Sequence, residues 1–214
     1  MGTGEAQLRN RERFGGAERA IARVLDPYEG KRGGGGRPGA GVVKVMGVDP
    51  GLMATGFGVL EARPGGVVVV DAGVISTTAG QALEARLNAL HGAVHRIIDA
   101  QKPSLLIVED LYTEYKFPRT AVLMGHARGV IYLAARQLGV VVLALAPSEV
   151  KRAVTGNGSA GKGQVQRAVQ TLLGLERLPH PSHVADALGL AVTGMARVTG
   201  QLPAGRATRG QVLR

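Results

Sequence analysis

The chain has 214 residues, of which 45% are hydrophobic, so it can bury the core of one sizeable domain. It contains no Cys and no Trp, which excludes a disulfide framework and a thiolate metal site. No apolar run reaches the roughly 18 residues that span a bilayer, and no signal-peptide core stands at the N-terminus, so we expect a cytoplasmic protein.

The formal net charge of +10 and a pI of about 10.6 favour a polyanionic partner, most simply nucleic acid. The charge is unevenly spread, because residues 42–196 hold 14 basic against 11 acidic residues while the last 18 residues hold four Arg and no acid. Basic tails can also serve only solubility, so the charge alone does not decide between these roles.

Residues 1–41 contain eleven of the 33 glycines, including four in succession at 33–36. Such a composition is typical of a flexible linker, so we expect a basic Gly-rich extension there. The predicted folded domain then covers residues 42–198, and a basic tail follows at 199–214.

The apolar run 42–48 predicts a strand buried on both faces, and Asp49 stands at its end before a Pro-Gly turn. A second apolar strand is expected over 55–60, where Gly56 and Gly58 leave room for a close backbone approach. A third strand over 67–75 would complete an antiparallel meander. Asp49 either caps the turn or faces a ligand or metal ion.

The period then changes to that of a helix over 81–100, followed by a short buried strand at 105–108 that leads into Glu109 and Asp110. A helix is expected over 119–137, with Gly125 and Gly129 packed tightly on the sheet. A strand at 140–145 and helices at 147–154, 163–174 and 182–198 complete the pattern. This order predicts an α/β protein with a mixed sheet and helices on both faces.

His183 and Asp186 lie one turn apart near the start of the last predicted helix, for which Ser182 is the expected N-cap. Residues at this spacing share a helix face and can reach one ion. The small residues Ala185, Ala187 and Gly189 would let the helix lie close to the sheet. A surface histidine without a ligand role is the alternative.

Four blocks together resemble the RuvC family of Holliday-junction resolvases, in the same order: GVDPG at 47–51, VED at 108–110, VKRAVTGNGSAGKGQVQ at 150–166 and PSHVADALGLA at 181–191. The resemblance implies an RNase H-like fold, in which a three-strand antiparallel meander and parallel strands form a five-stranded mixed sheet flanked by helices. It also implies a structure-selective endodeoxyribonuclease that resolves Holliday junctions by paired symmetric nicks in DNA recombination and repair.

By this resemblance the catalytic and metal-binding residues are Asp49, Glu109, His183 and Asp186. The expected cofactors are two ions of Mg²⁺ or Mn²⁺, which activate water and stabilise charge during phosphodiester hydrolysis. Some family members carry Asp where this chain has His183, and an imidazole suits Mn²⁺ better than Mg²⁺. A Mn²⁺ preference is therefore a hypothesis, and a proton-shuttling role for His183 is also open.

The resemblance further implies DNA-binding roles for Tyr112, Lys151 and Lys162. Solvated lysines and a core tyrosine are the alternatives. The chain departs from the family pattern in segment 112–124, which is one residue longer and contains Pro118, so Tyr115 or Phe117 could replace Tyr112 as the base-contacting ring. Gly161 and Gly163 replace bulkier residues and should loosen their loop.

The expected partners are four-way junction DNA, a second copy of the chain and a branch-migration complex of the RuvA and RuvB type. A junction with near two-fold symmetry is most simply cut by a C₂ homodimer, for which the 119–137 helix is a plausible interface.

Three other functions are considered. An RNase H-like nuclease acting on RNA or other branched DNA would share the metal site. An ATPase domain of the actin and sugar-kinase type also begins with such a glycine-rich strand, but it needs two domains. A junction-binding protein without activity would not need four site residues.

Overall fold

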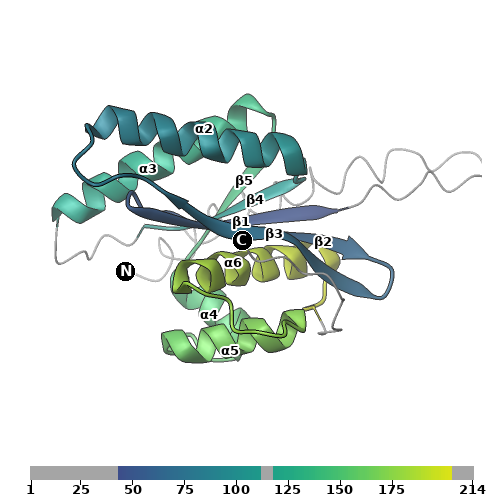
Figure 1. Cartoon of the computed structure of the whole chain (residues 1–214). Helices are drawn as coiled ribbons and strands as arrows, with labels where there is room; N and C mark the ends of the chain where they lie inside the picture. The colour runs from purple at the N-terminus through teal and green to yellow at the C-terminus, as the bar shows by residue number, and fades with distance from the viewer. Residues whose placement is uncertain (1–42, 112–117, 204–214) are drawn as a thin grey trace, which may run out of the picture. The chain divides into compact units, whose positions relative to one another are not determined.

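The computed structural model describes residues 43–111 and 118–203 of the chain. Most of the predicted extension and tail lies outside the described residues, so the domain limits stay predictions. Figure 1 shows the described elements, which are, in chain order, β1 (Lys44–Asp49), β2 (Ala54–Arg63), β3 (Gly66–Ser76), α2 (Leu83–Gln101), β4 (Leu105–Glu109), α3 (Pro118–Gln137), β5 (Val141–Leu145), α4 (Pro147–Thr155), α5 (Lys162–Leu173) and α6 (Ser182–Thr199).

The strands form one five-stranded sheet in the order β3-β2-β1-β4-β5. The first three strands make an antiparallel meander, while β4 runs parallel to both β1 and β5. The predicted mixed sheet is thereby confirmed. Because β1 and β4 are parallel neighbours, their carboxyl ends lie side by side at the same end of the sheet.

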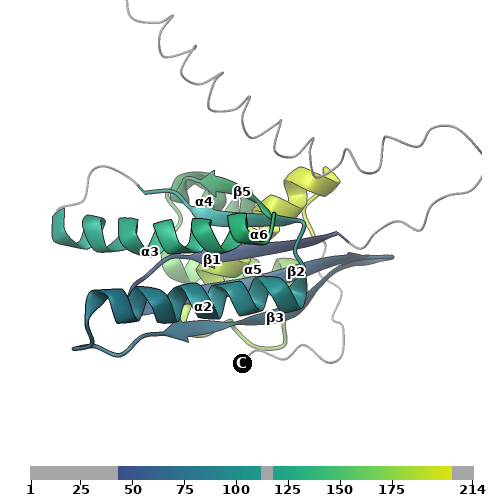
Figure 2. The same ribbon diagram turned by 90° about the horizontal axis from the view of Figure 1, so that it is seen from above.

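Helices cover both faces of this sheet: α2 and α3 lie side by side on one face, and α6 lies on the other with α4 and α5 beyond it (Figures 1 and 2). Side chains alternate along each strand. In β1, Met46 and Val48 join the apolar core under α2 and α3. Gly47, between them, faces α6, so the residue after Val48 also points to the α6 side.

Glycines in β1 and β2 let α6 lie directly on the sheet. A Cβ atom added at Gly47 would come within 2.1 Å of the Ala187 carbonyl oxygen, and one at Gly56 within 2.0 Å of the His183 carbonyl oxygen. A Cβ at Gly58 would meet the Leu188 side chain at 2.6 Å. The close approach expected at Gly56 and Gly58 is confirmed.

Two expectations about small residues are wrong. An added Cβ at Gly125 or Gly129 would meet nothing within 4 Å, because α3 turns Ala127 and Ile131 inward and leaves these glycines on its outer face. Gly189 of α6 faces Val150 and Val169 on α4 and α5 rather than the sheet. In both helices the period of 3.6 residues puts the glycines on another side from the residues that touch the sheet.

The predicted N-cap of the last helix is also wrong. Pro181 is the N-cap and Ser182 is already the first helical residue, because the Val184 N–H donates to the Pro181 carbonyl oxygen. The proline holds φ at −67° and so prepares the chain to enter the helix one residue earlier than expected. Among the described residues, no helix combines the length and apolar character needed to cross a membrane.

Candidate metal centre

Two of the predicted acids come from neighbouring strand ends. Asp49 is the last residue of β1 and Glu109 is the last residue of β4, and their preceding residues, Val48 and Val108, are register partners. Strand alternation turns both acids toward the face covered by α6. The sheet therefore brings together two carboxylates that are 60 positions apart in the chain.

The other two predicted residues come from the first turns of α6. The contact of Gly56 with the His183 backbone fixes this end of the helix over β2. His183 Nδ1 lies 2.7 Å from Asp49 Oδ2, at hydrogen-bond distance. One ligand atom each from Asp49, His183 and Asp186 lies within 4.8 Å of the others, which is a spacing that one metal ion could bridge.

Burial and mutual repulsion raise the pKa values of the acids. Burial and then the negative charges of Asp49 and Asp186 raise the pKa of Glu109 to about 7. Burial, followed by the charge of Asp49, also raises the pKa of Asp186. The pKa of Asp49 rises because burial outweighs the opposing effect of His183. Three acids crowded in this way favour a bound cation, which would stabilise their charged forms.

The two predicted DNA-binding lysines lie beside this cluster. Lys162 is the first residue of α5, and its charge opposes the rise in the pKa of Asp186 that burial and Asp49 produce. Lys151 of α4 similarly opposes the rise in the pKa of Glu109 that burial and the neighbouring acids produce. Tyr112, Tyr115 and Phe117 lie outside the described residues.

Two arginines near the end of the sheet that carries Asp49 and Glu109 were not predicted from the sequence. Arg86 of α2 donates from Nη2 to the Leu52 carbonyl oxygen at 3.2 Å and from Nε to Thr77 Oγ1 at 3.0 Å, which ties the loop after Asp49 to the helix. Arg128 of α3 is only 8% exposed and reaches Asp110, the residue after Glu109. A sequence signal for Arg128 did exist, because it lies three positions before Ile131 and residues at this spacing share a helix face, here the buried one.

Known proteins are similar in sequence to this chain. The family model described as crossover junction endodeoxyribonuclease RuvC matches residues 45–194. Proteins with this name from Rhodopirellula baltica and Moorella thermoacetica are 40% and 44% identical over 158 and 148 residues. These alignments cover 74% and 69% of this chain and, in both cases, 88% of the relative.

Solved structures agree with this match. The Thermus thermophilus RuvC structure is 32% identical with a TM-score of 0.67, and the structure of that protein in complex with a Holliday junction substrate gives 0.69. Each comparison covers 75% of this chain and 99% of the other, so the fold is the RNase H-like resolvase fold. By motif, fold and family model, the chain belongs to the RuvC family of crossover junction endodeoxyribonucleases, hydrolases that resolve Holliday junctions by endonuclease cleavage in recombination and repair.

Proposed function

We propose that Asp49, Glu109, His183 and Asp186 form the catalytic, metal-binding centre with which this endonuclease nicks four-way junction DNA. The observation that carries this proposal is the convergence of side chains from β1 and α6 within 4.8 Å. Glu109 lies near enough that the charges of Asp49 and Asp186 add to the effect of burial in raising its pKa. No single element of the fold holds the set, so its assembly depends on the whole sheet and on α6.

The donor set fits divalent ions such as Mg²⁺ or Mn²⁺. Carboxylate oxygens suit both ions, and the imidazole of His183 is a softer donor that favours Mn²⁺. We propose that the four side chains hold two such ions. When bound, divalent ions lower the pKa of a water molecule and stabilise the charge that develops on the phosphoryl and leaving oxygens.

The protein side chains have separable roles in this proposal. Asp49 is 11% exposed at its side chain and is fixed by the central strand, so it is the best placed residue to serve both ions. Glu109 and Asp186 each complete one side of the cluster. His183 is 43% exposed at its side chain and orients the Asp49 carboxylate through Nδ1, which leaves its other ring nitrogen for a metal ion; a proton-shuttling role in place of metal binding is the alternative.

Lys151 and Lys162 are proposed to bind phosphate groups of the DNA. Their position beside the acids supports this role, because a polyanion entering an acidic cluster needs nearby positive charge. Tyr112 remains the proposed stacking residue, with Tyr115 and Phe117 as alternatives. The junction complex of the Thermus thermophilus relative supports four-way junction DNA as the substrate.

A homodimer is proposed because symmetric nicking needs two sites. The outer face of α3 supports the choice of interface, since Val122 and Leu133 are 58% and 51% exposed there and Gly125 and Gly129 add no side chains. We define the α3 face by these four residues. Association with a branch-migration complex of the RuvA and RuvB type and a cytoplasmic location stay predictions.

The deciding experiment replaces Asp49 with Asn. The amide keeps the size of the side chain but is a much poorer metal ligand, so cleavage of a four-way junction should be lost while junction binding remains. Asp99→Asn is the matched control, because Asp99 lies on the exposed side of α2 and pairs with Lys102. Cleavage retained by the Asp49 variant would falsify the assignment.

The same assay separates the alternative substrate class. We expect cleavage of the four-way junction to exceed that of a flap or an RNA–DNA duplex under identical metal conditions. A preference for the RNA duplex or the flap would instead favour a related nuclease that uses the same metal centre.

A further inference from the structure

Arg128 is a buried charge on the face of the sheet opposite the metal centre. It is 8% exposed, and its Nη2 lies 3.3 Å from Asp110 Oδ1 and donates to the Tyr132 hydroxyl. Its guanidinium carbon lies 5.2 Å from the centroid of the Tyr132 ring. The Nη1 atom is buried and has no hydrogen-bond partner in the part of the chain that the structure describes.

The contacts of Arg128 contribute little to the free energy of unfolding. An ion pair with a buried member gains little over apolar side chains of the same size, since the guanidinium of Arg128 loses its hydration while the Asp110 side chain stays 23% exposed. A buried donor without a partner adds a further cost. The position of Arg128 therefore points to a use other than core packing.

Strand alternation shows what Arg128 holds. Glu109 points to the α6 face and the metal centre, so the next residue, Asp110, points to the α3 face, where Arg128 meets it. The Asp110 N–H also donates to the Leu145 carbonyl oxygen of β5 at 2.8 Å. The Leu111 N–H donates to Asp110 Oδ1 at 3.0 Å. The carboxyl end of β4 is thereby fixed immediately beside Glu109.

We propose that Arg128 is a positioning residue for Glu109 and that it acts through Asp110. The inference rests on the proposed metal-binding role of Glu109. Arg128 anchors Asp110 to α3 from one side of the sheet, and this anchor sets the height and direction of the Glu109 carboxylate on the other side. A small displacement there would weaken metal binding, whereas the proposed phosphate-binding residues Lys151 and Lys162 lie on other elements, α4 and α5.

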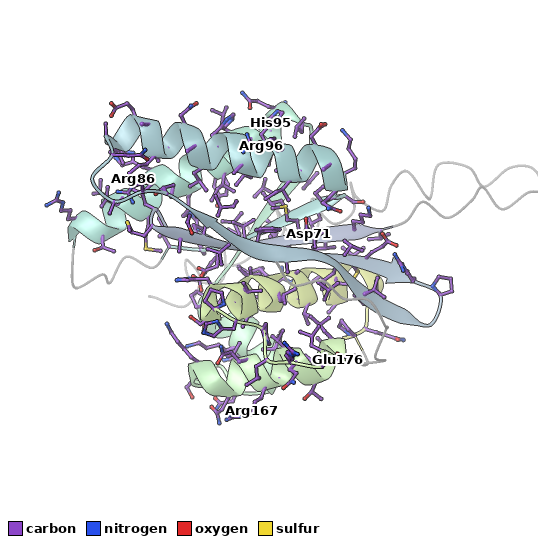
Figure 3. All side chains as sticks on the ribbon, in the orientation of Figure 1. Asp71, Arg86, His95, Arg96, Arg167 and Glu176 are labelled. Atoms are coloured by element: carbon purple, nitrogen blue, oxygen red, sulfur yellow. The ribbon has the colours of Figure 1, made fainter. Side chains whose placement is uncertain are left out.

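The first test is a metal titration of junction cleavage with Arg128→Met, which keeps an unbranched side chain but removes the charge and the donors. Loss of a residue that orients a metal ligand typically weakens metal affinity or activity by about 10- to 100-fold, so the half-saturating Mg²⁺ concentration should rise by at least about tenfold. Junction binding measured without divalent metal should not change. Arg96→Met is the matched control, because Arg96 is an exposed arginine of α2 (Figure 3).

A second pair of variants separates positioning from stability. Asp110→Asn breaks the same ion pair from the other side while keeping its shape, and it serves if Arg128→Met does not fold. The double variant Asp110→Asn with Arg128→Met leaves no unpaired buried charge, so it should recover thermal stability relative to Arg128→Met. Its metal requirement should stay raised, whereas a purely structural role would restore the wild-type requirement together with stability.

The outcomes keep this inference distinct from the proposed function. If Glu109→Gln cleaves junctions like the wild type, the role of Glu109 itself is wrong. If Glu109→Gln is inactive but folded Asp110→Asn shows the wild-type metal requirement, only the positioning role of Arg128 is overturned. A parallel loss of metal-free junction binding in the Arg128 variant would also overturn it.

Discussion

Glu109 shows how strongly one side chain depends on its surroundings in this fold. Burial and two neighbouring carboxylates raise its pKa to about 7, so near neutral pH the metal-free group is only partly ionised. In its proposed role as a metal ligand Glu109 must be ionised, so metal binding would release a proton. Metal affinity should consequently rise with pH through the neutral range.

A first prediction concerns the stability of the metal-free protein. The folded-state pKa of Glu109 lies above its unfolded value of 4.5. Below about pH 4.5 Glu109 is protonated in both states, so the folded protein keeps its full stability. As the pH rises from there through about 7, the unfolded state ionises more readily and the folded protein loses this stability. The shift corresponds to at most about 3 kcal/mol. Thermal unfolding in a chelator should show that Glu109→Gln loses less stability than the wild type when the pH is raised from about 5 to about 8. Equal pH slopes for the two proteins would contradict this prediction.

A second prediction concerns the choice of metal. His183 supplies a nitrogen donor 2.7 Å from Asp49, and we expect faster junction cleavage with Mn²⁺ than with Mg²⁺ at matched concentrations. His183→Asp replaces that donor with oxygen, so the ratio of the Mn²⁺ rate to the Mg²⁺ rate should fall. Equal wild-type rates with the two ions would count against the hypothesis.

At the scale of elements, the site depends on how closely α6 lies against β1 and β2. The helix carries His183 and Asp186, and glycines in the strands leave space for its backbone. Arg197 near the far end of α6 forms an ion pair with Glu149 of α4, so the helix is also held from the side away from the sheet. The distance between α6 and the sheet therefore controls the distance between the acids.

A third prediction follows from this packing. In Gly47→Ala the added methyl group would lie 2.1 Å from the Ala187 carbonyl oxygen, and backbone cannot move aside cheaply. We expect a loss of about 3 kcal/mol in unfolding free energy together with a large loss of cleavage.

Gly92→Ala is the control, because its Cβ would meet only the flexible end of Arg96 at 3.3 Å. That change should stabilise α2 by up to about 1 kcal/mol and leave cleavage unchanged. Chemical denaturation checks both variants. A Gly47→Ala protein as stable as the wild type would show that α6 can shift without cost.

At the scale of the whole molecule, a junction resolvase must make two cuts, whereas the described residues of each chain hold one candidate metal-binding group. The exposed apolar residues of the α3 face lie on the helix layer opposite α6 (Figure 1). Pairing through this face would leave the metal centres of both copies uncovered.

A fourth prediction tests this pairing. Leu133→Glu places a charge at one end of the α3 face, and sedimentation should then show a monomer in place of a dimer. On a plasmid with an extruded cruciform, single nicks should replace paired cuts. Leu178→Glu is the matched control, because Leu178 is 47% exposed but lies outside α3. A dimeric Leu133→Glu protein would place the interface elsewhere.

Periodicity in the sequence was sufficient for the order and type of the elements. Apolar runs such as 42–48 and the helical spacing in 81–100 are set by local burial, which the chain pattern records directly. Ser182 was predicted to be the N-cap of the last helix, but Pro181 takes that position and Ser182 is the first helical residue. Gly125 and Gly129 were misplaced because a glycine does not reveal whether it makes room for a neighbour or faces open space.

By itself, the sequence determined the strand ends that carry Asp49 and Glu109, the helix that carries His183 and Asp186, and the family to which the chain belongs. The tertiary structure decided that His183 meets Asp49 across 134 positions, because this contact depends on the parallel pairing of β1 with β4 and on the glycine surface under α6. It also revealed Arg128 behind Glu109. Neighbours in the chain fix the local shape, whereas only the packed sheet and helices bring distant charges close enough to change one another's pKa values.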